Sequence, residues 1–172
     1  MPEPHQTADY HLIPLTADHA RQILRWRYQP PYDFYNSPDT GVIEQQYIEQ
    51  FLDPTYAFHA IIDGQKLLAG FCSFGMDGQV HGGDYTDPAL DIGLGMRPDL
   101  TGQGQGVAFF TSILTFRQSH FYATRLRLTV AQFNRRALAL YKQFGFQETT
   151  EFTDPRHAIA YTVLNLDMTT RC

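Results

Sequence analysis

The sequence of 172 residues has few cysteines, no run of like charges and no long hydrophobic stretch. Its two cysteines, Cys72 and Cys172, allow one disulfide but no disulfide framework, so a reducing compartment is the simpler expectation. No apolar run approaches the ~20 residues that a membrane-spanning helix needs. The first residues also lack the basic segment and apolar run of a signal peptide. These absences predict a cytoplasmic protein that does not bind a membrane.

The charge distribution disfavours nucleic acid as a partner. The formal net charge is −5, and lysines and arginines form no continuous cluster along the chain. An acidic protein attracts a cationic ligand, such as an amine, more readily. The seven histidines show no metal-ligand spacing such as H-E-x-x-H, and the cysteines form no ligand pair. We therefore expect no metal site.

Length and composition predict one globular domain. Hydrophobic residues make up 43% of the chain and charged residues 18%, which is typical of proteins with a packed core. A chain of this length can bury a substantial core. We expect a single domain over residues 1–172, with its folded core from about 10 to 166.

The periodicity of apolar residues predicts the element order β-α-α-β-β-β-α-β-α-β-β. Asp63-Gly64 predicts a tight hairpin with positive φ at both central residues. The strand–helix–strand order from Ala89 to Val130 predicts a parallel crossover. Together these features predict an α+β fold with a mixed, mostly antiparallel sheet and helices on both faces. The expected strands are Tyr10–Leu15, Tyr56–Ile62, Lys66–Phe74, Ala89–Met96, Arg125–Val130, Gln147–Phe152 and Ala158–Leu166, and the expected helices are Ala17–Tyr28, Val42–Leu52, Val107–Phe121 and Arg135–Phe144.

Three alternating glycines, Gly102, Gly104 and Gly106, connect the strand that ends at Met96 to the helix that begins at Val107. Glycine lets the backbone approach a ligand and adopt positive φ, and a helix N-terminus presents unpaired N–H groups with a partial positive charge. This arrangement predicts a site for phosphate oxygens. The dinucleotide pattern G-x-G-x-x-G and the P-loop are both absent. An enzyme that binds a nucleotide in another way remains one alternative.

The glycine turn resembles the acyl-CoA pyrophosphate loop of the GNAT family of N-acetyltransferases, which is written R/Q-x-x-G-x-G/A. Thr101, Gly104 and Gly106 fill the three marked positions, and Thr101 departs from the usual Arg or Gln. A second segment, residues 130–146, resembles the family pattern N-x-x-A-x-x-L-Y-x-x-x-G-F. Two motifs in the family's order are far more specific than either alone, and the element order also resembles the family's fold. The second pattern is matched at Asn134, Ala137, Leu140, Tyr141, Gly145 and Phe146.

The resemblance implies an enzyme that transfers acetyl from acetyl-CoA to an amine by direct attack in a ternary complex. Backbone groups of Leu94 and Met96 would pair with the pantetheine arm like an added strand, and the Met96 N–H would stabilise the developing oxyanion. Asn134 would hydrogen-bond the same arm, and Tyr141 would donate its phenolic proton to the departing thiolate. The diphosphate would lie on the turn formed by Thr101, Gly102, Gln103, Gly104, Gln105, Gly106 and Val107.

Several of these residues also have a purely structural interpretation. Asn134 is a good helix N-cap, and Tyr141 lies on an apolar helix face and fits a core position. Gly93 and Gly95 alternate in the strand before the turn. They either leave a bare floor for a ligand or make room for a bulge or a close aromatic neighbour.

The general base is less well defined by the sequence. Asp91 is the carboxylate nearest the expected reaction centre, with His59 and His81 as alternatives. A carboxyl of this type titrates near ~3.9 and needs burial or a water relay to act at neutral pH. A hydrogen-bonded structural role is the other interpretation of Asp91.

The acceptor is expected between the first two helices, where the family has a lid. Tyr32, Asp33 and Tyr35 lie there, and aromatic rings with a carboxylate suit an amine of a small molecule or peptide. A rigid packed loop is the alternative. Arg135 and Arg136 either reach the cofactor's phosphates or are solvated. A non-catalytic acyl-CoA-binding module also remains open, as does the oligomeric state, with a homodimer as one option.

Overall fold

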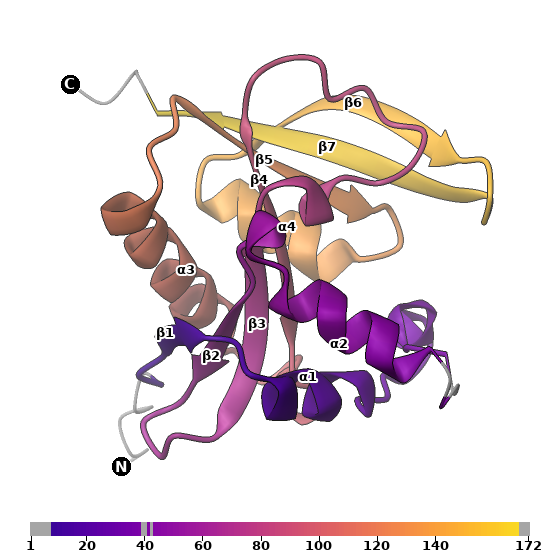
Figure 1. Ribbon diagram of the computed structural model, residues 1–172. Helices are drawn as coiled ribbons and strands as arrows, with labels where there is room; N and C mark the ends of the chain where they lie inside the picture. The colour runs from indigo at the N-terminus through magenta and orange to yellow at the C-terminus, as the bar shows by residue number, and fades with distance from the viewer. Residues whose placement is uncertain (1–7, 39–40, 42, 169–172) are drawn as a thin grey trace, which may run out of the picture.

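One mixed sheet organises the molecule (Figure 1). The computed structural model describes residues 8–38, 41 and 43–168. The sheet has seven strands in the order β1-β2-β3-β4-β5-β7-β6, and all neighbours are antiparallel except β4 and β5. The predicted fold class is therefore confirmed. The strands are β1 His11–Pro14, β2 His59–Ile62, β3 Leu68–Phe74, β4 Leu90–Met96, β5 Arg125–Ala131, β6 Gln147–Asp154 and β7 Ile159–Asp167.

Helices cover both faces of the sheet because its central strands alternate between two apolar cores. On β2, Ala60 packs in the core beneath α1 and α2, whereas the next residue, Ile61, packs in the core beneath α3 and α4. Within the described residues, no helix is long and apolar enough to cross a membrane. The α-helices are α1 Ala17–Leu24, α2 Glu44–Leu52, α3 Gly106–His120 and α4 Arg135–Gln143, and short 3-10 helices are η1 Tyr32–Tyr35, η2 Pro54–Tyr56, η3 Met76–Gly78 and η4 Pro98–Leu100.

Helix α1 is shorter than predicted. Thr16 caps its start and exchanges hydrogen bonds with His19, as in a capping box. Its end lies at Leu24 and not at Tyr28, because Arg27 folds back and donates to the Leu24 carbonyl at 3.0 Å. The residues from Arg25 onward therefore do not continue the α-helix, and they form the connection to α2 that contains η1. The predicted second helix began at Val42, which lies outside the described residues.

The hairpin between β2 and β3 is confirmed, but its turn differs from the prediction. Positive φ occurs at Lys66 (64°), and neither Asp63 nor Gly64 has it. The Asp63 carboxylate accepts the amides of Gln65 and Leu67, both at 2.9 Å. This local side-chain capping favours a longer loop over the two-residue turn.

The parallel strands β4 and β5 separate shortly after they begin to pair. Among the described residues, their pairing joins Leu90 to Leu126 and Asp91 to Arg127 and extends no further. The other edge of β4 stays paired with β3 up to Met96. The C-terminal half of β4 therefore has one backbone edge that forms no hydrogen bonds with a neighbouring strand of the described chain.

Candidate functional site

The glycine turn has the backbone conformation that the sequence predicts. Gly102 and Gly104 have φ of 71° and 74°, values that other residues adopt at a cost. Gln105 precedes α3 without a capping side-chain bond, so the first N–H groups of the helix keep their donor capacity. An added Cβ on Gly104 would meet nothing within 4 Å. The turn is therefore a bare, positively polarised cradle that fits phosphate oxygens.

The side chain of Thr101 is engaged outside the turn. The Thr101 hydroxyl donates to the Pro98 carbonyl at 2.7 Å, so it closes η4 and does not reach into the cradle. A role for Thr101 at the cradle would thus fall to its backbone groups. A groove of about 1030 Å³ between α3 and β1 is bordered by Gln103, Gly104, Gln105 and Val107.

Gly106 brings α3 and α4 together. A Cβ at this position would lie 3.2 Å from the nearest methyl carbon of Leu140 on α4. One turn further along α3, the Phe110 ring contacts the rings of Tyr141 and Phe144, each at a centroid distance of 4.9 Å. The close approach of the two helices places the start of α4 beside the glycine turn.

Asn134 is an N-cap and also faces the predicted acceptor lid. Its Oδ1 accepts the amide of Ala137 at 3.2 Å, which caps α4 as expected from the sequence. Its Nδ2 donates to the Tyr35 hydroxyl at 3.4 Å. The two interpretations of Asn134 are therefore compatible, because each uses a different atom of the amide.

Tyr141 is buried between α3 and the chain that follows α4. Its ring packs on Phe110 and Phe146, and the residue is 6% exposed. Burial raises the pKa of its phenol well above the usual value, and the neighbouring phenol of Tyr35 raises it further. Within the described part of the chain, its hydroxyl has no hydrogen-bond partner. The group is therefore a neutral phenol with its proton available for donation.

The predicted lid is the 3-10 helix η1 and not an irregular loop. Tyr32 and Tyr35 lie 6.2 and 5.6 Å from the ring of Phe133, measured between centroids, and Phe133 comes from the turn before α4. Phe34 contacts Phe133 as well and is 39% exposed. Asp33 is exposed at the start of η1. The lid thus combines packed rings with a solvent-accessible carboxylate.

The free edge of β4 points toward the gap between β4 and β5. The Asp91 carbonyl accepts the Gly75 amide, and the Arg97 amide donates to Ala69 on β3. Because hydrogen-bonding residues alternate along an antiparallel strand, the amides and carbonyls of Leu94 and Met96 face the opposite edge. The Met96 carbonyl accepts the Tyr28 hydroxyl at 2.7 Å.

The β4 glycines do not form a bare floor. A Cβ on Gly93 would lie 2.5 Å from the Ser73 hydroxyl oxygen, and one on Gly95 would lie 2.5 Å from the Phe71 ring. Of the two explanations that the sequence allowed, the close aromatic neighbour is the one found at Gly95. The protein's own side chains fill this face of β4, so any ligand at this strand must use its edge.

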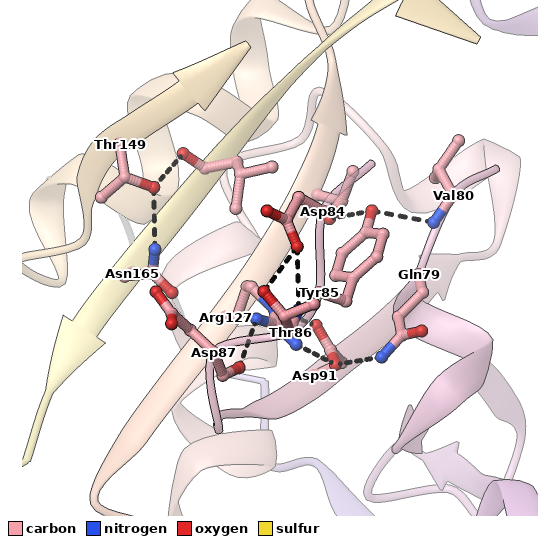
Figure 2. Close-up of polar contacts among 12 residues, drawn as sticks. Gln79, Val80, Asp84, Tyr85, Thr86, Asp87, Asp91, Arg127, Thr149 and Asn165 are labelled. Carbon is pink, nitrogen blue, oxygen red and sulfur yellow. Dashed lines mark hydrogen bonds and ion pairs between the residues drawn. The ribbon is translucent and has the colours of Figure 1, made fainter. Parts of the chain in front are cut away.

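Asp91 is part of a buried polar network and lacks the freedom expected of a general base (Figure 2). Arg127 grips its carboxylate with Nε–Oδ1 and Nη2–Oδ2 distances of 2.6 and 2.8 Å. Gln79 donates to Oδ2 at 2.9 Å, and Asp91 is only 3% exposed. Arg127 also donates to the Asp87 carbonyl and lies over the Tyr85 ring. The contacts favour the structural role, in which Asp91 ties residues 79–87 to the sheet.

Within the described residues, neither alternative base forms a hydrogen bond or ring contact with Met96, Asn134 or Tyr141, where the reaction centre is expected. The Nδ1 of His59 lies at hydrogen-bond distance from the Ala57 carbonyl, and the imidazole ring packs on Phe116 and Phe121. Phe116 lies ten residues after Gly106, which is ~15 Å along α3. His81 is exposed in the connection before β4. In the described ranges, no group of acidic, histidine or cysteine side chains is arranged to hold a metal ion.

The structure brings together residues that the sequence had placed in three separate segments. Tyr35 from η1 accepts a hydrogen bond from Asn134 at the start of α4, and the Tyr35 phenol, after burial, contributes to the raised pKa of Tyr141 in the last turn of the same helix. Tyr28 and Phe133 pack on the Tyr35 ring, and Tyr28 also donates to the Met96 carbonyl; the sequence singled out neither residue. Neither has a local signal, because their contacts are with residues far away in the chain.

The comparisons with known proteins agree with this geometry. A family model described as the acetyltransferase (GNAT) family matches residues 18–146, about three quarters of the chain. No curated protein sequence matches the chain. The matched range contains the glycine turn, β4 and the whole of the second motif.

Solved structures resemble the whole fold at low sequence identity. A spermidine N-acetyltransferase from Vibrio cholerae, in complex with CoA and spermine, is 17% identical with a TM-score of 0.71, covering 94% of this chain and 96% of that one. The aminoglycoside acetyltransferase AAC(6')-Ib, in complex with ribostamycin and CoA, is 14% identical with a TM-score of 0.71, covering 95% and 98%. At these identities the likeness describes the fold alone.

Proposed function

The chain belongs to the acetyltransferase (GNAT) family, and from that premise we propose that it transfers an acetyl group from acetyl-CoA to a primary amine by direct attack in a ternary complex. The observation that carries the proposal is that α4 packs against the glycine turn at Gly102 and Gly106, while Asn134 at the start of α4 contacts Tyr35 of the lid. The helix that carries a candidate cofactor ligand and a candidate proton donor thus contacts both the cradle and the lid.

The cofactor would be held mainly by backbone groups. The N–H groups of the turn from Gly102 to Gly106 and the start of α3 would bind its diphosphate. The edge of β4 at Leu94 and Met96, which no described strand covers, would pair with the pantetheine amides. The Met96 carbonyl also accepts the Tyr28 hydroxyl. Asn134 would lie beside this arm. When bound, acetyl-CoA supplies an activated thioester. The chain's own tasks are to orient it, exclude water and supply a proton.

Tyr141 would supply that proton. Its phenol is neutral, because burial raises the pKa, and its hydroxyl is not committed to another residue within the described chain. A Met96 N–H directed into the gap would stabilise negative charge on the carbonyl oxygen during transfer. No side chain is assigned as general base, since the Asp91 carboxylate is held by Arg127 and Gln79.

The acceptor would lie under the lid formed by Tyr32, Asp33 and Tyr35. Aromatic faces attract a protonated amine, and the exposed Asp33 carboxylate adds a charge contact. The solved relatives named above contain spermine and ribostamycin, both of which carry amines. We propose an amine of a small molecule or peptide for this chain as well. A cytoplasmic location, a homodimer and the single domain remain predictions.

Isothermal titration with acetyl-CoA and with CoA tests this function. We expect heat of binding at micromolar to low millimolar cofactor, and release of free CoA in a screen of amines, amino acids and peptides. Competition by ATP or NAD tests the alternative of a nucleotide site, which predicts that these ligands displace CoA. No binding of either CoA form would reject the proposal.

A non-catalytic acyl-CoA-binding module is the second candidate. It is favoured by the engagement of Asp91 in the buried network and of Thr101 with Pro98. This module would bind CoA in the titration but release no free CoA with any acceptor. Turnover with one acceptor is enough to exclude it.

Gly104→Ala tests the cradle itself. The substitution meets no steric obstacle in the free protein, but its φ of 74° is unfavourable for alanine. We expect the free energy of unfolding to fall by about 1 kcal/mol and the CoA affinity to fall because a methyl group enters the cradle. Gly64→Ala is the matched control, since Gly64 also has open space but no positive φ. Denaturant unfolding and calorimetry measure both; equal CoA affinity in the two variants would contradict the assignment.

A further inference from the structure

Arg136 occupies a position between the cofactor cradle and the acceptor lid. Its Nη1 lies 2.8 Å from the point that a Cβ on Gly102 would occupy. The same guanidinium lies over the Tyr32 ring, with its carbon 4.1 Å from the ring centroid. One side chain therefore touches the phosphate cradle and the lid at once.

The donors of Arg136 are uncommitted. In the part of the chain that the structure describes, Arg136 forms no ion pair and no hydrogen bond, and the residue is exposed. A guanidinium presents five N–H donors in a planar fork that matches phosphate oxygens. Its stack on Tyr32 fixes the plane of the fork beside the turn without using any of these donors. The side chain is thus held ready for an anion in the cradle.

The connection between α1 and α2, which carries the lid, contacts residues of the proposed cofactor site at two further points. The Tyr28 hydroxyl donates to the Met96 carbonyl at 2.7 Å, and Asn134 donates to the Tyr35 hydroxyl at 3.4 Å. All three contacts join the connection between α1 and α2 to a group proposed to bind the cofactor. The position of the lid therefore depends on the groups that hold the cofactor.

We propose that Arg136 binds the diphosphate of the cofactor and, through its stack on Tyr32, couples cofactor binding to the placement of the acceptor lid. This inference rests on the proposed function. Tyr32 holds the guanidinium in its binding position, so loss of the ring weakens cofactor binding although Tyr32 lies on the acceptor side. By linkage, bound cofactor stabilises the lid by the same factor. Arg136 is then a cofactor-binding residue, and Tyr32 is the positioning residue that links it to the acceptor lid.

The test measures CoA dissociation constants of four single variants. Arg136→Ala is expected to weaken CoA binding about tenfold, as for the loss of charge-assisted hydrogen bonds. Arg135→Ala is the matched control, because Arg135 is the adjacent exposed arginine on the same helix, and it is expected to stay within about twofold of the wild type. Tyr32→Leu is expected to weaken CoA binding about threefold. Tyr32→Phe, which keeps the aromatic ring, is expected to bind CoA with the affinity of the wild type.

The double variant Arg136→Ala with Tyr32→Leu isolates the coupling. We expect it to bind CoA as Arg136→Ala alone does, because the ring acts only through the guanidinium. The Arg136→Ala loss should persist with 3′-dephospho-CoA, which keeps the diphosphate, and disappear with pantetheine. Thermal melts of all variants check that each is folded.

Each result decides one claim. Equal effects of the Arg136 and Arg135 variants, or a loss confined to CoA with its 3′-phosphate, overturn the diphosphate assignment. Additive effects in the double variant overturn the coupling to the lid. Both results leave the proposed function intact, which fails separately if the wild-type protein binds no CoA.

Discussion

Replacing Tyr141 with Phe is expected to lower kcat for acetyl transfer by about 10²-fold or more while changing the dissociation constant of CoA by less than about threefold. The substitution removes only the hydroxyl. Ring contacts with Phe110 and Phe146 remain, so the fold is expected to stay intact. Steady-state kinetics with an identified acceptor, together with CoA titration, measure the two quantities.

Tyr10→Phe is the matched control for this experiment. Tyr10 is also a buried tyrosine packed against a phenylalanine of α3, namely Phe109, but it lies on the β1 side of the core. Its variant is expected to keep the wild-type kcat. An unchanged kcat in the Tyr141 variant would remove this phenol as the acid, and equal losses in both variants would indicate a general effect of losing a buried hydroxyl.

The pH dependence of turnover follows from the same phenol. Burial raises the pKa of Tyr141, so its protonated form is fully present below that pKa and is lost only as the pH rises through it. An ordinary tyrosine already stays protonated to about pH 10. We therefore expect no loss of kcat between about pH 7 and pH 10 from this group. A pH–rate profile with a falling limb near neutrality, absent in the Phe variant, would contradict the assignment.

Arg127→Met is expected to lower the free energy of unfolding by about 3–5 kcal/mol, a large share of the stability of a typical domain. The variant leaves the Asp91 carboxylate buried without its cation and removes the bond to the Asp87 carbonyl. The double variant with Asp91→Leu is expected to recover much of the loss, because both charges are then absent. Denaturant unfolding gives these free energies.

Arg125→Met serves as the control on the same strand. Arg125 pairs with Asp167 at 2.7 Å, but 37% of its side chain and 55% of the aspartate side chain are exposed, against 5% and 4% for the buried pair. A much smaller change is expected, because water already solvates these charges. Similar losses in the two arginine variants would show that burial of the Asp91 pair adds little.

Asp91→Asn separates the structural role of this residue from catalysis. The amide keeps the shape but loses the charge that Arg127 grips. We expect lower stability with kcat of the folded protein nearly unchanged. A fall in kcat of about 10²-fold or more at full folding would restore Asp91 as the general base.

Many features that depend on neighbours in the sequence were predictable from the sequence alone, although the turn after Asp63 and the end of α1 were not. Asn134 caps α4 and Gly145 ends it with positive φ, because both signals act within one helical turn. Gly102 and Gly104 likewise adopt the left-handed conformation that their pattern predicts. The order of elements, the class of fold and the glycine cradle could all be predicted from such local sequence patterns.

Contacts between distant segments were decided by the tertiary structure. The partner of Asp91 is Arg127, 36 residues away, and only the parallel pairing of β4 with β5 brings the two together. The space above Gly95 is filled by Phe71 on β3, a contact that the strand pattern alone could not distinguish from an open surface for a ligand.

The contacts of Arg136 also depend on tertiary packing. Arg136 contacts Gly102 and Tyr32 because Gly106 lets α3 and α4 approach closely. Periodicity and capping specify which elements form, but they carry no information on which side chains meet when those elements pack, and the chemistry of the site depends on these meetings.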